Sequence, residues 1–132
     1  MSGRDKAGRV FFVLGSVVLI ASAALHCFGG YRMLSLALSA SNLNPGLQAA
    51  LRVVFLSLGW HWVVAAIVAL LAGLTETRLR KILILLCGFA VLIEAGVGAS
   101  MMGFFIGNEL IGSAAVLLIC GGLLVEKSRA QT

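Results

Sequence analysis

Four long apolar stretches account for most of this sequence and constrain its fold more than any other feature. They cover roughly residues 10–31, 50–74, 82–106 and 109–125. A helix needs about 20 apolar residues to cross the hydrocarbon of a bilayer, and it pairs its backbone amides within itself. A β-barrel would need alternating polar and apolar residues, which these stretches lack. We therefore expect an all-α fold, a four-helix transmembrane bundle that forms one domain over residues 1–132.

The composition agrees with a protein whose surface faces lipid. Charged residues make up 11% of the chain and hydrophobic residues 61%, with a mean hydropathy of +1.08. A soluble domain carries about 25% charged residues, and so small a globule cannot hide this much apolar surface. The three cysteines all fall within the apolar stretches and form no CxxC pair, so neither a zinc finger nor a disulfide framework is indicated.

The positive charges are divided unequally between the two sides of the expected bundle. Only Arg32 and Arg52 fall on the side of the first and third connections. By the positive-inside rule, both termini should be cytoplasmic, in a bacterial-type inner (plasma) membrane. Topology thus explains the net charge of +5, and we expect no nucleic-acid partner. The eight basic residues on the inner side are Arg4, Lys6, Arg9, Arg78, Arg80, Lys81, Lys127 and Arg129.

The connection over residues 31–52 is the longest in the chain. Its first part is apolar but interrupted by serines, and we expect a short interfacial helix there on the outer side. Asn44 followed by Pro45 is typical of an N-cap and a first helical turn, so the second spanning helix should begin near Pro45 and protrude beyond the hydrocarbon. The short connection at residues 106–108 predicts an antiparallel hairpin of the last two helices.

One ionisable residue stands in each predicted helix: His26, His61, Glu94 and Glu109. At about 1.5 Å per residue, all four lie roughly 20–25 Å from the inner boundary and share one layer in the outer half of the membrane. Each lies on a helical face rich in small residues, which lets membrane helices pack closely. A charged group in hydrocarbon costs roughly 2.5–3.5 kcal/mol, so we expect these four side chains to converge inside the bundle.

Glu94 is the strongest functional candidate because it lies far from either end of its apolar stretch. Apolar surroundings disfavour the charged form of an acid, so we expect Glu94 to exchange a proton, with His61 as its partner in any catalytic step. Further residues expected to contact a ligand are His26, Trp60, Trp62, Asn108 and Glu109.

Structural roles remain open for the same four residues. Glu109 suits the first turn of a helix, where the helix dipole favours a carboxylate. His26 suits an interface, His61 a hydrogen bond to a backbone carbonyl, and Glu94 a protonated acid bonded across helices.

Three classes of function fit this layer. The first is binding, or proton-coupled transport, of an apolar or cationic small molecule. The second is a membrane enzyme or oxidoreductase. It would use a metal ion held by His26, His61, Glu94 and Glu109, or a b-type haem held by the two histidines. A pocket for an apolar substrate would also suit an enzyme. The Glu-x-x-His pairing of bundle metal centres is absent. The third is an accessory subunit of a larger membrane complex or a homo-oligomer, packed through small residues such as Gly103 and Gly107.

The segment "LLICGGLLV" near the C-terminus resembles the end of the small multidrug-resistance transporters, which are also four-helix proteins of similar length. The resemblance is confined to a few residues. Those transporters place their essential acid in the first helix, where this chain has His26, so the chain is not identified as a member.

Overall fold

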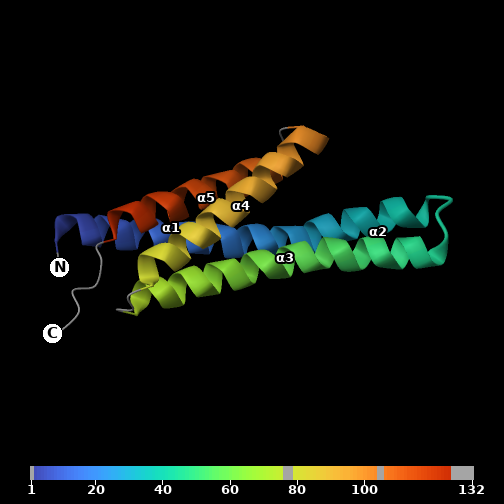
Figure 1. Ribbon diagram of the computed structural model, residues 1–132. Coiled ribbons are helices and arrows are strands. Elements are labelled where there is room, and N and C mark those ends of the chain that lie inside the picture. The colour runs from blue at the N-terminus through green and yellow to red at the C-terminus, as the bar shows by residue number, and fades with distance from the viewer. Residues whose placement is uncertain (1, 76–78, 104–105, 126–132) are drawn as a thin grey trace.

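The computed structural model describes residues 2–75, 79–103 and 106–125, and these form helices joined by short connections (Figure 1). No strand occurs within these ranges, so the all-α prediction is confirmed. The elements are α1 (Gly3–Leu25), the π-helix η1 (His26–Gly30), α2 (Tyr31–Ser39), α3 (Pro45–Leu74), α4 (Arg80–Met102) and α5 (Ile106–Leu124).

In the part of the chain that the structure describes, four helical runs are long and apolar enough to cross a membrane. The first combines α1, η1 and α2 into one run, Gly3–Ser39, and the others are α3, α4 and α5. Large apolar side chains lie exposed on each of them, for example Val10, Val64, Ile93 and Val116. Their number agrees with the four predicted spans, which the structure lengthens at several ends.

The helices form two antiparallel hairpins. The first hairpin is α1–η1–α2 with α3, and the second, shorter hairpin is α4 with α5 (Figure 1). The hairpins pack through α1 against α5 and through α3 against α4. We call the end that holds the N-termini of α1 and α4 the basic end, because Arg4, Lys6, Arg9, Arg80 and Lys81 lie there. Away from it, the last turns of α4 diverge from α2 and α3 (Figure 1).

A short helix, α2, is present after residue 31 as expected, but it continues the first helical run instead of standing apart from it. Backbone angles stay helical through Gly30 and Tyr31, and the helical run ends only at Ser39. The serines do not break it, since the Ser39 hydroxyl donates to the carbonyl of Ser35 at 2.8 Å within the same helix. The π-helical turn shifts the register of the run at His26–Gly30 without ending it.

Helix boundaries follow local capping. The Asn44 side chain accepts a hydrogen bond from the amide of Leu47 at 2.8 Å, and Pro45 occupies the first turn of α3, as predicted. At the other connection, α4 ends at Met102 rather than near residue 106. Gly103 adopts a φ of 76°, a positive value that glycine reaches without the steric cost of a Cβ, and the helix ends there. α5 consequently begins at Ile106, earlier than expected.

Glycines allow α1 and α5 to approach each other closely. A Cβ placed on Gly121 would lie 2.7 Å from the backbone nitrogen of Phe12 and 3.0 Å from the carbonyl oxygen of Gly8. A Cβ on Gly8 would in turn lie 2.9 Å from the backbone nitrogen of Val125. Contact between backbones is how small residues stabilise helix pairs in membranes, where dispersion replaces the hydrophobic effect.

Gly121→Ala should therefore destabilise the protein, because the new methyl group meets backbone atoms that cannot rotate away. We expect a loss of about 1–3 kcal/mol, measured as thermal unfolding by circular dichroism in one detergent. Gly96→Ala is the matched control: a Cβ there meets nothing within 4 Å, and its stability should be unchanged or higher. Equal melting temperatures for the two variants would contradict this packing.

Candidate functional site

Glu94 on α4 is held by two consecutive side chains of α3. The Nδ1 of His61 lies 2.6 Å from Oε1 of Glu94, and the indole Nε1 of Trp62 donates to Oε2 at 2.7 Å. An indole N–H can only donate, so this bond favours a carboxylate oxygen as acceptor. Each oxygen of Glu94 thus has its own partner, and the predicted pairing of His61 with Glu94 is present in the structure.

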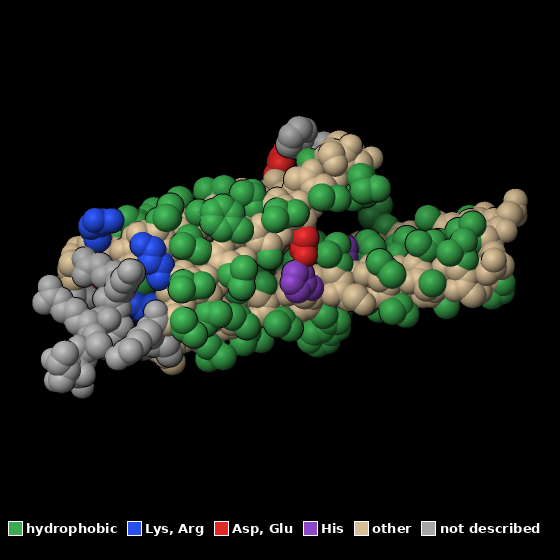
Figure 2. All heavy atoms as spheres, in the orientation of Figure 1, with side chains coloured by type: hydrophobic (Ala, Val, Ile, Leu, Met, Phe, Trp, Pro, Cys, Tyr) green, Lys and Arg blue, Asp and Glu red, His purple; other side chains and the backbone are tan. Residues whose placement is uncertain are grey.

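The pair lies at the side of the bundle rather than in its centre. The side chain of Trp62 is buried, whereas that of Glu94 is 27% exposed and that of His61 is 48% exposed. In Figure 2 a histidine and an acidic side chain lie together on the surface, beside the hollow where the second hairpin parts from the first. The carboxylate is therefore anchored from inside the protein, and its imidazole partner faces outward.

His26 supports this arrangement from η1. Its Nε2 lies 2.8 Å from the backbone oxygen of Phe55, and because a carbonyl only accepts, Nε2 carries the hydrogen. The imidazole stacks on the Phe55 ring, with centroids 3.7 Å apart, and meets the Trp62 ring at 4.8 Å in a tilted contact. His26 thus packs against the residue that anchors Glu94, and it is His26, not His61, that bonds a backbone carbonyl.

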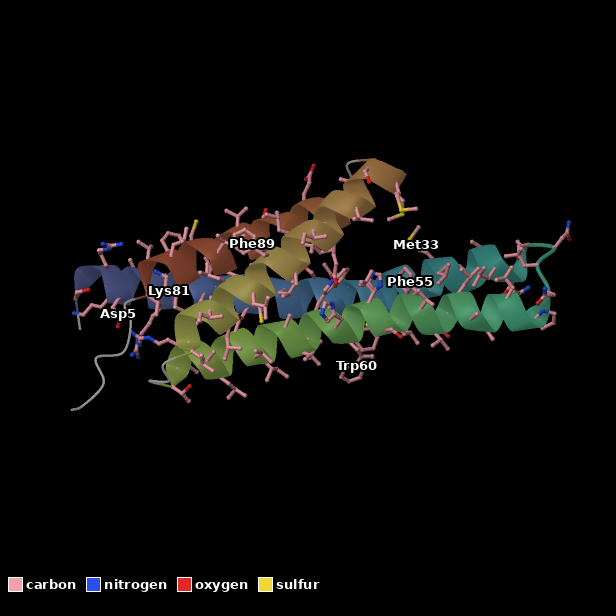
Figure 3. The ribbon with its side chains drawn as sticks, viewed as in Figure 1. Asp5, Met33, Phe55, Trp60, Lys81 and Phe89 are labelled. Atoms are coloured by element: carbon pink, nitrogen blue, oxygen red, sulfur yellow. The ribbon has the colours of Figure 1, made fainter. Side chains whose placement is uncertain are left out.

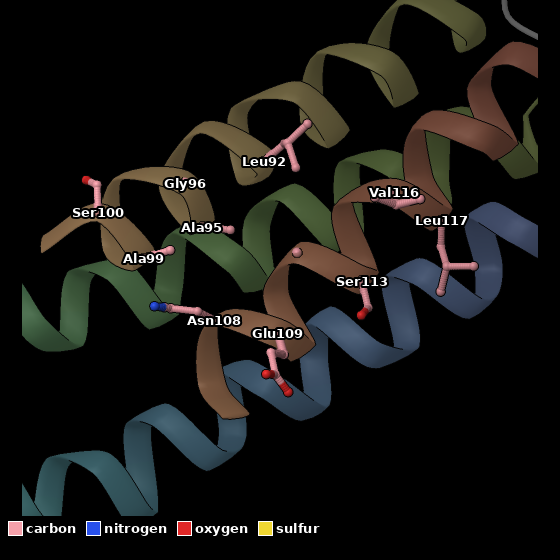
Figure 4. Close-up of a pocket in the computed structure, with 11 residues that line it drawn as sticks. Leu92, Ala95, Gly96, Ala99, Ser100, Asn108, Glu109, Ser113, Val116 and Leu117 are labelled. Atoms are coloured by element: carbon pink, nitrogen blue, oxygen red, sulfur yellow. The ribbon is translucent and has the colours of Figure 1, made fainter. Parts of the chain in front are cut away.

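Glu109 does not join the other three residues. It is exposed on α5 and lines a separate groove of about 1010 Å³ between α4 and α5, which also holds Ser100 and Ser113 (Figure 4). The buried Asn108 side chain donates to the Gly103 carbonyl at 3.1 Å and so braces the start of α5. The expectation that four ionisable residues converge was therefore wrong, because α5 packs against α1 and α4 and carries Glu109 away from Glu94.

The two tryptophans have opposite environments. Trp62 is 3% exposed, while Trp60 is 66% exposed and points away from the bundle (Figure 3). The small residues predicted to share a face with His61, such as Ala65, Ala69 and Ala72, are buried. Trp62 lies in the middle of that buried face and His61 at its rim, which explains why the imidazole is exposed.

The predicted metal ligands are not assembled. Within residues 2–75, 79–103 and 106–125, no three His, Cys, Asp or Glu side chains lie close enough together to hold a metal ion. The two histidines are also engaged by different partners, His26 by the Phe55 carbonyl and His61 by Glu94. Neither the four-ligand metal site nor haem ligation by both histidines has a matching geometry in the described residues.

A second polar cluster, at the basic end, was missed by the sequence reasoning. Asp5 of α1 and Arg80 of α4 form an ion pair at 3.0 Å, and their residues are 4% and 5% exposed. Arg9 lies one turn after Asp5, with Nε 3.7 Å from the second carboxylate oxygen. The available signal is an acid four residues before an arginine at the start of an apolar helix, whereas the positive-inside rule uses these arginines only as charges that set topology.

No protein-family model matches this sequence, and no curated protein or solved structure matches it either.

The bond from Trp62 to Glu94 can be tested with the neighbouring tryptophan as control. Trp62→Phe keeps an aromatic ring but removes the donor, and we expect it to lower the free energy of unfolding by about 1.5–3 kcal/mol. Trp60→Phe removes an exposed side chain and should change it by no more than about 0.5 kcal/mol. Denaturation followed by circular dichroism measures both, and a Trp62 variant as stable as the Trp60 variant would contradict the bond.

Proposed function

We propose that this protein is an integral membrane protein that binds a small molecule at the Glu94–His61 pair and releases a proton in exchange. The observation that carries the proposal is the carboxylate itself. It lies in the middle of an apolar helix, both of its oxygens are hydrogen-bonded, and it remains partly exposed at the side of the bundle. An acid inside a membrane span is costly and usually serves function.

Helix lengths support insertion across a bilayer. From Lys81 to Met102, α4 rises about 32 Å, close to the thickness of the hydrocarbon. In the first hairpin, about 35 Å separates Arg9 from Arg32 along one arm and Thr75 from Arg52 along the other. Arg32 and Arg52 thus mark the outer boundary, and the residues between them, 33–51, extend beyond it. The excess of basic residues at the other end favours cytoplasmic termini in a bacterial-type inner membrane.

The pair is suited to exchanging one positive charge for another. Nδ1 of His61 and Oε1 of Glu94 lie 2.6 Å apart, and the exchange starts from the protonated pair, an imidazolium that donates to a carboxylate and becomes a neutral imidazole when its proton leaves. A cationic or hydrogen-bond-donating group that reaches this oxygen competes directly with that proton. In surroundings of low dielectric, two positive charges beside one carboxylate repel each other strongly. One carboxylate therefore stabilises a single positive charge far better than it stabilises two. The proton then leaves by way of His61 toward the hollow beside the pair, where the second hairpin parts from the first (Figure 2).

The position of the pair indicates where the molecule enters. Glu94 lies about 20 Å from Lys81 along α4, within the depth of the hydrocarbon. Its neighbours on the exposed face are apolar, including Ile93 and Val97. An amphipathic molecule, with an apolar body and a cationic or polar group, therefore fits a route from the lipid phase better than a fully hydrated solute does.

Residues 33–51, at the end of the first hairpin away from the basic end, favour a second candidate function. The chain would then be a subunit of a homo-oligomer or of a larger membrane complex. There the structure leaves Met33 73% and Leu36 67% exposed. Exposed apolar patches beyond the membrane are common at protein interfaces. Purification in mild detergent followed by native mass spectrometry distinguishes an oligomer or complex from a single chain.

Proton exchange is tested with dodecyltrimethylammonium, a permanently charged amphiphile, added to the protein in nanodiscs with a pH-indicator dye. We expect saturable proton release from the native chain and from Glu109→Gln, whose carboxylate lies outside the pair. Glu94→Gln should release none, since it cannot hold the exchangeable proton. Release that persists in folded Glu94→Gln would refute the exchange at this site.

Topology is tested by labelling single cysteines in a chain whose native cysteines are replaced by alanine. An impermeant maleimide applied to intact bacterial cells should label Asn42→Cys, in the exposed connection between α2 and α3. It should label Lys6→Cys only after the membrane is made permeable. The opposite pattern would invert the proposed orientation.

A further inference from the structure

We infer that the Asp5–Arg80 ion pair is a latch: it holds the Glu94–His61 site closed toward the basic end, and its release opens the site there. The inference rests on the proposed function, because it describes how access to the same site is controlled. It concerns a movement of the two hairpins relative to each other.

The ion pair joins the two hairpins where they begin. Asp5 lies in the first turn of α1 and Arg80 in the first turn of α4, so the ion pair, at 3.0 Å, connects the two hairpins at the basic end, beside the packing of α1 on α5. Asp5 lies at this end in Figure 3. The Ser2 hydroxyl accepts from the Asp5 amide at 3.2 Å and fixes the turn that presents the carboxylate.

The hairpins are parted at the other end. Met101 and Met102 at the end of α4 are 79% and 69% exposed, and this part of α4 diverges from the first hairpin (Figure 1). The Glu94–His61 pair lies between the joined end and the parted end. The site is therefore open toward the end where α4 diverges and closed toward the basic end.

The contact between the site and the basic end consists of small, apolar residues on α3. Its buried positions there include Ala66 and Ala69, and the buried residues of α4 between its first turn and the site are Ile84, Gly88 and Val91. Apolar side chains form no hydrogen bonds that would fix one register, and packed helices can slide or part along such a face in small steps. The Asp5–Arg80 ion pair, a directional interaction at the end of this contact, then decides whether the hairpins are joined or parted at the basic end.

A buried ion pair is suited to that role. While it is intact, both charges are satisfied; removing one partner leaves the other charge buried and favours any arrangement in which water reaches it. Replacing both partners by neutral side chains removes the latch and takes the Asp5 carboxylate away from only one other charge, Arg9, whose side chain is 29% exposed. The single and the double variants should thus open the basic end, with the double variant folding more readily.

The test measures distances between spin labels by double electron–electron resonance in nanodiscs, in a background with Cys27, Cys87 and Cys120 changed to alanine. Val10→Cys with Ile82→Cys reports on the basic end, and Met33→Cys with Met101→Cys reports on the parted end; all four side chains are exposed. In Asp5→Asn/Arg80→Gln, we expect a longer component to appear at the basic end and a shorter one at the parted end.

Arg4→Gln is the matched control, because it removes a charge from an exposed residue of the same helical turn and leaves the pair intact. It should leave both distributions unchanged. Unchanged distributions in the folded double variant would overturn the latch. The distances are measured without a ligand and repeated with Glu94→Gln, so they do not depend on proton exchange. Altered distances together with absent proton release would support the latch and overturn the proposed function alone.

Discussion

The structure depends on how one carboxylate is satisfied in the middle of an apolar helix. Glu94 has bonds to His61 and Trp62, which are adjacent on α3. Side chains of neighbouring helical residues point about 100° apart. His61 and Trp62 can therefore both reach the Glu94 carboxylate only if it lies between the directions in which they point. This requirement fixes the register of α3 against α4. It also places Trp62 inside the bundle and leaves His61 at its edge, where a molecule from outside can reach it.

The rest of the bundle keeps that contact in place while leaving space beside it. Glycines bring the backbones of α1 and α5 together, and the Asp5–Arg80 pair ties α1 to α4 at the basic end. No comparable bond joins the hairpins among the described residues at the other end, where α4 diverges. The Glu94–His61 site is thus partly buried, at the side of the bundle. A position of this kind suits the exchange of a proton for a bound molecule.

Much of the architecture could be predicted because it follows from local patterns. Apolar length predicted four helices, and Asn44 with Pro45 predicted the start of α3. The end of the first helical run could not be predicted, since serines that bond within a helix look the same in sequence as serines that end one. The pairing of Glu94 with His61 was predicted from depth and from the cost of an unpaired charge.

Other parts of the site needed the packing of helices far apart in sequence. Depth alone placed Glu109 in the same layer as Glu94, but depth does not specify which helix faces which. The choice between Trp60 and Trp62 depends on a rotation of α3 that its uniformly apolar sequence leaves undetermined. Asp5 and Arg80 are 75 residues apart, and each looks like an ordinary charge near a membrane surface. Only the tertiary arrangement shows that they are buried together.

The account is tested most directly by locating the Glu94 carboxylate in a lipid bilayer. Solid-state NMR can measure the dipolar coupling between ¹⁵N in the His61 ring and ¹³C in the Glu94 carboxyl group, with His26→Gln and Glu109→Gln used to assign the signals. The account predicts a strong coupling between these two nuclei, as expected for a direct hydrogen bond. A Glu94 carboxyl signal with no coupling to His61 in the folded protein would contradict it.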